Sequence, residues 1–266
     1  MTGRYSGGVM RGRPFYERLA AGSFLFVPAA YLLLGAVLLA LGDRSPPGVL
    51  RILTVASAAS VVGALLIVWT PRLLVASLVV GVLILLVGLG PGAFGLGHPD
   101  SFFDFMTSLV TVVGALGAVV AAASALRLRH RGVSRDSRGI DRALVKAALV
   151  CLAIAAISSA LLTRTHRTNA AAPAGATVVE LRIDKFVPST LHVTRGERTR
   201  VFVVNRDSYA HTFSVDALSL DEYIAPHGTR LITFDVPASG AGRLSLYCAV
   251  TGHENMTGTI FIEPRA

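Results

Sequence analysis

The hydrophobic positions of this chain form two different patterns, which meet near residue 164. Before it, five apolar segments come close to the roughly 20 helical residues that cross a hydrocarbon layer. They are Leu19–Leu41, Val49–Thr70, Leu73–Leu89, Phe105–Leu126 and Ala143–Leu162. After residue 176, short apolar stretches alternate with Gly, Pro, Asp and Asn. The first pattern predicts membrane-spanning helices, and the second predicts β-strands joined by turns.

The second and third apolar segments are separated only by Trp69-Thr70-Pro71-Arg72. The run from Val49 to Leu89 is too long for one span, and Pro71 disfavours a continuous helix, so we expect a tight helical hairpin there. The first segment is too long for the apolar core of a typical cleavable signal peptide, and four more segments follow it. We therefore expect an α-helical membrane bundle of about five transmembrane helices in residues 1–163.

Short polar segments predict the orientation of these spans. Basic residues gather in the N-terminal tail and between the fourth and fifth spans, whereas the loop Gly90–Asp104 has no Lys or Arg. Cytoplasmic loops carry the excess of basic residues, so we expect the N-terminus to be cytoplasmic. Five spans then place the C-terminal part on the extracytoplasmic side of a multi-pass cell-membrane protein. The basic residues concerned are Arg4, Arg11, Arg13, Arg18, Arg127, Arg129, Arg131, Arg135, Arg138 and Arg142.

Composition supports a membrane part and argues against nucleic acid as a partner. Hydrophobic residues make up 53% of the 266 residues, and the mean hydropathy is +0.61. Residues 1–175 contain 16 basic and 6 acidic side chains, whereas residues 176–266 contain 9 and 10. Because the excess positive charge belongs to the apolar half, it reflects membrane topology, and the partners we expect are a lipid bilayer and no nucleic acid.

Residues 164–176 are small or polar and have no apolar period, so they predict a flexible linker. Residues 177–266 then contain strand-like stretches separated by turn residues, a spacing that is typical of an all-β sandwich. The expected strands are Val178–Ile183, Thr190–Thr194, Arg200–Asn205, Thr212–Val215, Arg230–Phe234, Arg243–Tyr247 and Thr259–Ile262.

The candidate chemistry lies near the end of the chain. Cys248, His253 and Met256 fall within nine residues, and His211 begins an apolar, strand-like run upstream. Two imidazoles, one thiolate and a weak thioether form the ligand set of a mononuclear electron-transfer copper centre. The other cysteine, Cys151, lies in an apolar segment, so we expect no disulfide and an unpaired Cys248 thiol available for metal.

Residues 176–264 resemble the cupredoxins, the small blue-copper proteins that include plastocyanin and azurin. The resemblance rests on Phe186-Val187-Pro188, Leu191 to Glu197, Val203 to Asp207, His211-Thr212-Phe213, the Cys-His-Met loop and Thr257-Gly258-Thr259-Ile260. It implies a Greek-key sandwich that binds one copper ion through His211, Cys248, His253 and Met256. One departure is Thr212, where several members have Asn, so no residue is identified for the hydrogen bonds that usually stiffen the cysteine region.

We therefore expect a membrane-anchored type 1 copper protein that passes single electrons between a redox donor and an acceptor and has no catalysis of its own. Docking would use an apolar patch around His253. A dinuclear copper centre needs a second cysteine in the ligand loop, a multicopper oxidase needs His-x-His pairs, and a zinc hydrolase needs an open coordination position. The sequence supplies none of these. Copper acquisition, storage or delivery remains the alternative, as does a quinone-interacting role for the membrane half.

We expect less specific roles for several other polar and small residues. We expect His98, Asp100 and Asp104 to lie on a solvated loop, with a second metal site as the alternative. We expect His192 and His227 to be surface or packing histidines. Small residues at four-residue spacing in the fourth span, among them Gly114, Gly117 and Ala118, permit close contact with another helix.

Overall fold

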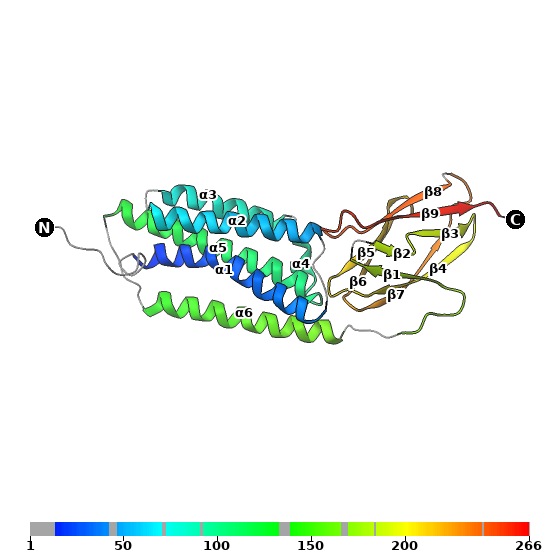
Figure 1. Ribbon diagram of the computed structural model, residues 1–266, viewed down its shortest axis with the longest axis horizontal. Helices are drawn as coiled ribbons and strands as arrows, with labels where there is room; N and C mark the ends of the chain where they lie inside the picture. Colours follow the sequence, from blue (N-terminus) through cyan, green and yellow to red (C-terminus); the bar gives the residue numbers. More distant parts are fainter. Residues whose placement is uncertain are drawn as a thin grey trace. The chain divides into compact units, whose positions relative to one another are not determined.

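The computed structural model describes residues 14–42, 47–70, 73–90, 93–132, 139–165, 170–183, 185–240 and 242–265. Contacts divide the chain into two compact units. The first consists of Met1–Leu34, Leu53–Ala93 and Thr107–Ala155, and it is helical. The second consists of Gly35–Ile52, Phe94–Met106 and Ala156–Ala266, and it contains every strand among the described residues (Figure 1).

Six helices precede the strands in the described part of the chain. They are α1 (Phe15–Ala40), α2 (Pro47–Trp69), α3 (Leu74–Leu89), α4 (Ala93–Gly97), α5 (Phe102–His130) and α6 (Gly139–Thr165). Four of them, α1, α2, α5 and α6, are long and apolar enough to cross a membrane. The third expected span forms α3, whose 16 residues extend for about 24 Å at roughly 1.5 Å per residue, less than the roughly 30 Å of a hydrocarbon layer.

Small residues on α5 form the contact with α1, as their spacing predicted. A side-chain carbon added at Gly117 would lie 2.9 Å from Oγ of Ser23, and one added at Gly114 would overlap Val27. Ala118 and Ala122 on the same helix are fully buried. Close approach of the two helices therefore depends on the absence of larger side chains along this stripe of α5.

Polar contacts join three helix ends in the first unit. Arg129, at the end of α5, forms a salt bridge of 2.7 Å with the buried Glu17 at the start of α1. Tyr16 donates a 3.3 Å hydrogen bond to Asp141 at the start of α6. The start of α1, the end of α5 and the start of α6 thus lie together. The sequence prediction that these three ends lie on one side of the membrane requires this proximity. Of the basic residues behind that prediction, Arg4, Arg11, Arg13, Arg135 and Arg138 lie outside the described residues.

The β-strands form a sandwich of two sheets. One sheet has the order β2-β1-β4-β7, and the other has the order β3-β9-β8-β5-β6. Parallel pairs such as β1–β4 and β3–β9 join strands that are distant in sequence, whereas β1–β2, β5–β6 and β8–β9 are hairpins. The strands are β1 (Thr177–Arg182), β2 (Lys185–Val187), β3 (Thr190–Thr194), β4 (Arg198–Asn205), β5 (His211–Val215), β6 (Leu220–Ile224), β7 (Thr229–Asp235), β8 (Arg243–Tyr247) and β9 (Thr257–Glu263).

All seven expected strands are present, and β2 and β6 are additional. Inward-facing residues of both sheets form one core, in which Phe213, Leu246 and Ile260 are fully buried. Cys248 and Met256 belong to the same core cluster. The core therefore reaches the end of the sandwich at which the candidate ligands lie. The expected linker is bracketed by α6, which ends at Thr165, and β1, which begins at Thr177; its residues 166–169 lie outside the described residues.

Candidate metal centre

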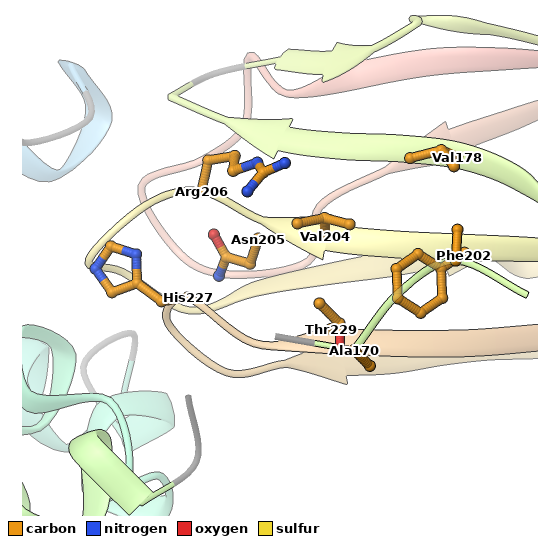
Figure 2. A pocket seen from close by; sticks show the side chains of 9 residues that line it. Ala170, Val178, Phe202, Val204, Asn205, Arg206, His227 and Thr229 are labelled. Carbon is orange, nitrogen blue, oxygen red and sulfur yellow. The ribbon is translucent and has the colours of Figure 1, made fainter. Parts of the chain in front are cut away.

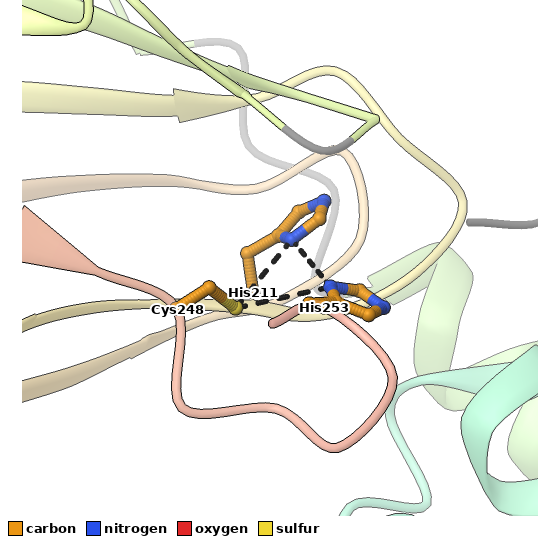
Figure 3. Close-up of side chains that lie close together, drawn as sticks. All are labelled: His211, Cys248 and His253. Atoms are coloured by element: carbon orange, nitrogen blue, oxygen red, sulfur yellow. Dashed lines mark hydrogen bonds between the residues drawn. The ribbon is translucent and has the colours of Figure 1, made fainter. Parts of the chain in front are cut away.

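Three of the four predicted ligands bring their donor atoms together (Figure 3). The Sγ of Cys248 lies 3.8 Å from Nδ1 of His211 and 3.8 Å from Nδ1 of His253, and the two Nδ1 atoms are 3.0 Å apart. His211 and His253 are fully buried, and Cys248 is 5% exposed. Within the described residues, this is the one group of three or more His, Cys, Asp or Glu side chains close enough to hold a metal ion.

The spacing of the three donors fits a single metal ion. In a triangle with sides of 3.8, 3.8 and 3.0 Å, the point equidistant from the corners lies about 2.1 Å from each, which matches a metal–imidazole bond and is about 0.2 Å shorter than a metal–thiolate bond. No side chain has to move by more than a few tenths of an ångström to meet that ion. Two nitrogens and one thiolate in a plane are also the ligand types that a type 1 copper ion takes.

Each donor is held by a different part of the second sheet and its loop. His211 is the first residue of β5, Cys248 directly follows β8, and His253 lies in the loop that leads to β9. The backbone closes this loop, because the N–H of Cys248 donates to the carbonyl of Met256 at 3.1 Å and the N–H of Met256 donates to that of His253 at 2.9 Å. Gly252, at φ +93°, permits the turn before His253.

Met256 is fully buried next to β9, in the core cluster that includes Cys248. Its backbone N–H and carbonyl are both used to close the ligand loop. Its role as an axial ligand stays a prediction that rests on the ligand pattern of the sequence.

Thr212 supplies the hydrogen bonds around the cysteine that the sequence left unassigned. Its backbone N–H donates to Cys248 Sγ at 3.3 Å, and its hydroxyl accepts a 2.7 Å bond from the N–H of Ala249. The same hydroxyl lies 2.8 Å from the hydroxyl of Ser214, which in turn donates to Asp221 at 2.7 Å. Thr212 is 5% exposed, so its side of these bonds is shielded from water.

Asp207 orients His211 and was not singled out by the sequence. Its Oδ2 lies 2.7 Å from Nε2 of His211, on the opposite side of the imidazole from the metal-facing Nδ1. Asn205 holds Asp207 in turn, because its Oδ1 accepts a 2.9 Å bond from the Asp207 N–H. A buried carboxylate that binds the outer nitrogen of a ligating histidine fixes the ring and increases its basicity. The signal in the sequence is an acidic residue four positions before His211.

The two histidines of the candidate centre differ in pKa. Burial alone lowers the pKa of His211, but the hydrogen bond to Asp207 and the adjacent Cys248 outweigh it and raise the pKa to about 9. Burial and the nearby His211 lower the pKa of His253 to about 3, which keeps this imidazole neutral. A neutral imidazole is the form that binds metal. A cation at the centre would take the place of the proton that His211 otherwise carries.

Two expectations about exposed groups, and the alternative of a second metal site, are wrong. Asp104 does not lie on a solvated loop, because it is 8% exposed and its Oδ2 accepts a 2.9 Å hydrogen bond from the backbone N–H of Ala210. His98 does not join it in a metal site; its ring stacks on Phe94 and Tyr223, with centroids 4.3 Å from each. His253 does not form part of an exposed apolar patch either, since it is fully buried.

His192 and His227 do not belong to the group of three donors. His192 is exposed and pairs with Glu263 at 2.8 Å. His227 lies at one end of a pocket on the first sheet, with Phe202 toward the other end (Figure 2). Polar groups of this pocket are already engaged, because Asn205 donates to three carbonyls and Arg206 binds Glu180. Both histidines therefore fit the surface or packing roles expected for them.

Comparison with known proteins gives one family match, which includes the sandwich. Residues 149–262 match the family described as the Cupredoxin-like domain. Similar solved structures include an oxidised amicyanin variant (23% identity over 35% of this chain and 86% of that one, TM-score 0.28) and auracyanin B (18% identity, 37% and 95%, TM-score 0.30). A chain of a haem-copper terminal oxidase dimer is 15% identical over 47% of this chain and 100% of its own, with a TM-score of 0.30. No curated protein sequence gives a significant match.

Proposed function

This chain carries a cupredoxin-like domain after helices that are long and apolar enough to cross a membrane, and we propose that it is a membrane-anchored type 1 copper protein that transfers single electrons. The observation that carries the proposal is the convergence of two Nδ1 atoms and one Sγ at distances that suit one metal ion. His211, Cys248 and His253 would hold the ion, with Met256 as the axial ligand.

Copper would supply a couple between Cu(II) and Cu(I), and the donor set favours copper over other metals. A thiolate selects softer metals, and a thioether is a poor ligand for zinc. The set also has no water-bearing position of the kind that a hydrolytic zinc ion needs. Electron transfer without catalysis is the chemistry that such a closed centre supports.

The surroundings of the donors favour a centre that changes little between oxidation states. Asp207 fixes the ring of His211, and Thr212 fixes the region of Cys248. Backbone hydrogen bonds within the ligand loop fix His253 relative to Met256. Because these bonds join protein groups to one another, they hold the donors in place whether or not metal is present, and little reorganisation accompanies each electron.

We propose the same division of the chain as its sequence pattern predicts. Residues 1–163 form the membrane part, residues 164–176 the linker, and residues 177–266 the copper domain. The N-terminus is cytoplasmic and the copper domain extracytoplasmic, where a protein donor and acceptor would meet it. The near-neutral copper domain offers little long-range steering by charge.

The test is copper loading of the purified full chain in detergent. We expect one Cu(II) per chain, intense visible absorption from sulfur-to-copper charge transfer and a narrow copper hyperfine splitting. Cys248→Ser should abolish the colour, whereas Cys151→Ser, the matched control at the other cysteine, should keep it. Met256→Leu should keep the colour and raise the reduction potential, because loss of the thioether leaves Cu(II) less well coordinated.

Colourless, tetragonal copper or no stoichiometric uptake would contradict electron transfer through a type 1 centre. The rate at which Cu(I) is released to a chelator distinguishes electron transfer from the alternative function, copper delivery. An electron carrier retains copper through many redox cycles, whereas a protein for copper delivery releases it quickly.

A further inference from the structure

A segment that is distant in sequence covers the candidate centre. Phe94–Met106 contains α4 from its second residue onward and the first residues of α5, and it belongs to the same compact unit as the β-sandwich. From it, the buried carboxylate of Asp104 accepts the hydrogen bond from the N–H of Ala210. Ala210 is fully buried and directly precedes His211. The contact therefore acts on the backbone that positions the first ligand.

Two further contacts lie on the His253 side of the centre. The ring of Phe103 lies 5.7 Å from that of Tyr209, and the Tyr209 ring lies 6.3 Å from His253. Val49 packs so closely on Gly252 that an added side-chain carbon there would lie 2.8 Å from it. The Nε2 of His253 is buried and has no hydrogen-bond partner among the described residues. These contacts leave no exposed edge of His253 for a partner to touch.

Because Asp104 is buried, its carboxyl group depends on hydrogen bonds from the protein. A carboxylate taken out of water is destabilising unless hydrogen bonds compensate for its lost hydration. Asp104 accepts such bonds from the Ser101 hydroxyl and from the Ala210 N–H. If the segment moved away, the Ala210 N–H would lose its side-chain acceptor. The arrangement thus couples the position of the segment to the backbone of the ligand strand.

We propose that Asp104 is a positioning residue of the copper centre, which holds the Ala210–His211 backbone in place and anchors the segment 94–106 over His253. The role in copper binding rests on the proposed function, but the coverage of the ligands does not. A soluble redox protein cannot reach the His253 edge while the segment is in place, so exchange at this edge requires the segment to move.

The first experiment uses the copper-loaded full chain in detergent, with Asp104→Ala, Asp104→Asn and the exposed control Asp235→Ala. We expect Asp104→Ala to release Cu(I) to bicinchoninic acid about tenfold faster, as loss of a buried hydrogen bond implies, and to alter the copper hyperfine splitting. Asp104→Asn keeps an acceptor oxygen and should restore most of both properties. Release and splitting in Asp104→Ala that equal those of the wild type and of Asp235→Ala would overturn the proposal.

The second experiment needs no metal, so its outcome does not depend on whether the proposed function is correct. In a metal-free Cys151→Ser background, iodoacetamide can label only Cys248, and Asp104→Ala should speed this labelling severalfold. Phe103→Ala keeps the Asp104 carboxylate and should also speed labelling. If Asp104→Ala does not fold, this second variant tests whether the segment 94–106 covers the site. Labelling at the wild-type rate in the folded variants would show that the segment does not cover the site.

Discussion

The backbone N–H of Thr212 donates a hydrogen bond to the Sγ of Cys248, and the Thr212 hydroxyl accepts one from Ala249, the residue after the cysteine. Threonine at this position therefore joins β5 to the ligand loop through both its backbone and its side chain. A hydrogen bond to a thiolate stabilises its negative charge, and the second bond limits how far the cysteine backbone can move.

Replacing Thr212 with Val should destabilise the domain while the copper centre still forms. Valine has nearly the same shape and keeps the backbone bond to Cys248, but it removes the acceptor of the Ala249 N–H and a partner of the buried Ser214 hydroxyl. We expect a loss of about 1–3 kcal/mol in the free energy of unfolding, measured by denaturant titration of the metal-free protein. Thr212→Ser retains the hydroxyl and should lose much less. Equal stability of the valine and serine variants would rule out a role for the hydroxyl.

Replacing Asp207 with Asn should raise the reduction potential of bound copper. Its buried carboxylate, 2.7 Å from Nε2 of His211, stabilises Cu(II) more than Cu(I), because the oxidised ion carries one more positive charge. Loss of such an outer partner weakens metal binding by roughly 10- to 100-fold, and each tenfold loss confined to Cu(II) raises the potential by about 59 mV.

Potentiometric titration followed at the visible band measures the Asp207 effect. Asp235→Asn, which removes an exposed carboxylate on β7, serves as the control and should leave the potential unchanged. A potential in Asp207→Asn that is equal to or below the wild-type value would mean that the carboxylate does not act on the metal through His211.

Local sequence patterns predicted the ligand loop, but they did not predict contacts between residues that are far apart in the sequence. Cys248, His253 and Met256 lie within nine residues, so their spacing alone brings them together. Asp104 contacts Ala210 across 106 positions, and no sequence period links them. The strand β6 was missed because Leu-Asp-Glu-Tyr-Ile places two acidic residues side by side, and only its pairing with β5 makes it a strand.

The membrane part shows the same division between local and distant information. Apolar length predicted the helices α1, α2, α5 and α6. A break was predicted at Pro71, which lies outside the described residues; α2 ends before it at Trp69, and the shorter α3 begins after it at Leu74. Four-residue spacing of small residues predicted that α5 has a contact face, but it could not tell which helix would be the neighbour. The partner of Gly114 and Gly117 is α1, which precedes them by about 90 positions.

Replacing Gly114 with Leu should destabilise the helical unit. An added side-chain carbon at Gly114 meets Val27 and lies 3.3 Å from the backbone oxygen of Ser23, so α1 and α5 would have to separate. Overpacking of this kind typically costs about 1–3 kcal/mol. Gly35→Leu on α1 is the matched control, because no atom lies within 4 Å of a carbon added there. The midpoint of thermal unfolding in detergent should fall for Gly114→Leu and not for Gly35→Leu.

Reporters fused to the chain test the proposed orientation. An alkaline phosphatase fused after Ala266 should be active, because it folds only outside the cytoplasm, whereas a fusion after Thr2 that precedes all spans should be inactive. The contact of Arg129 with Glu17 places the end of α5 beside the start of α1, so a fusion placed after His130 should behave like the N-terminal one. Removing the positive charges between α5 and α6 should weaken this preference. An inactive fusion at Ala266 would mean that an even number of segments crosses the membrane, which would contradict the proposed location of the copper domain.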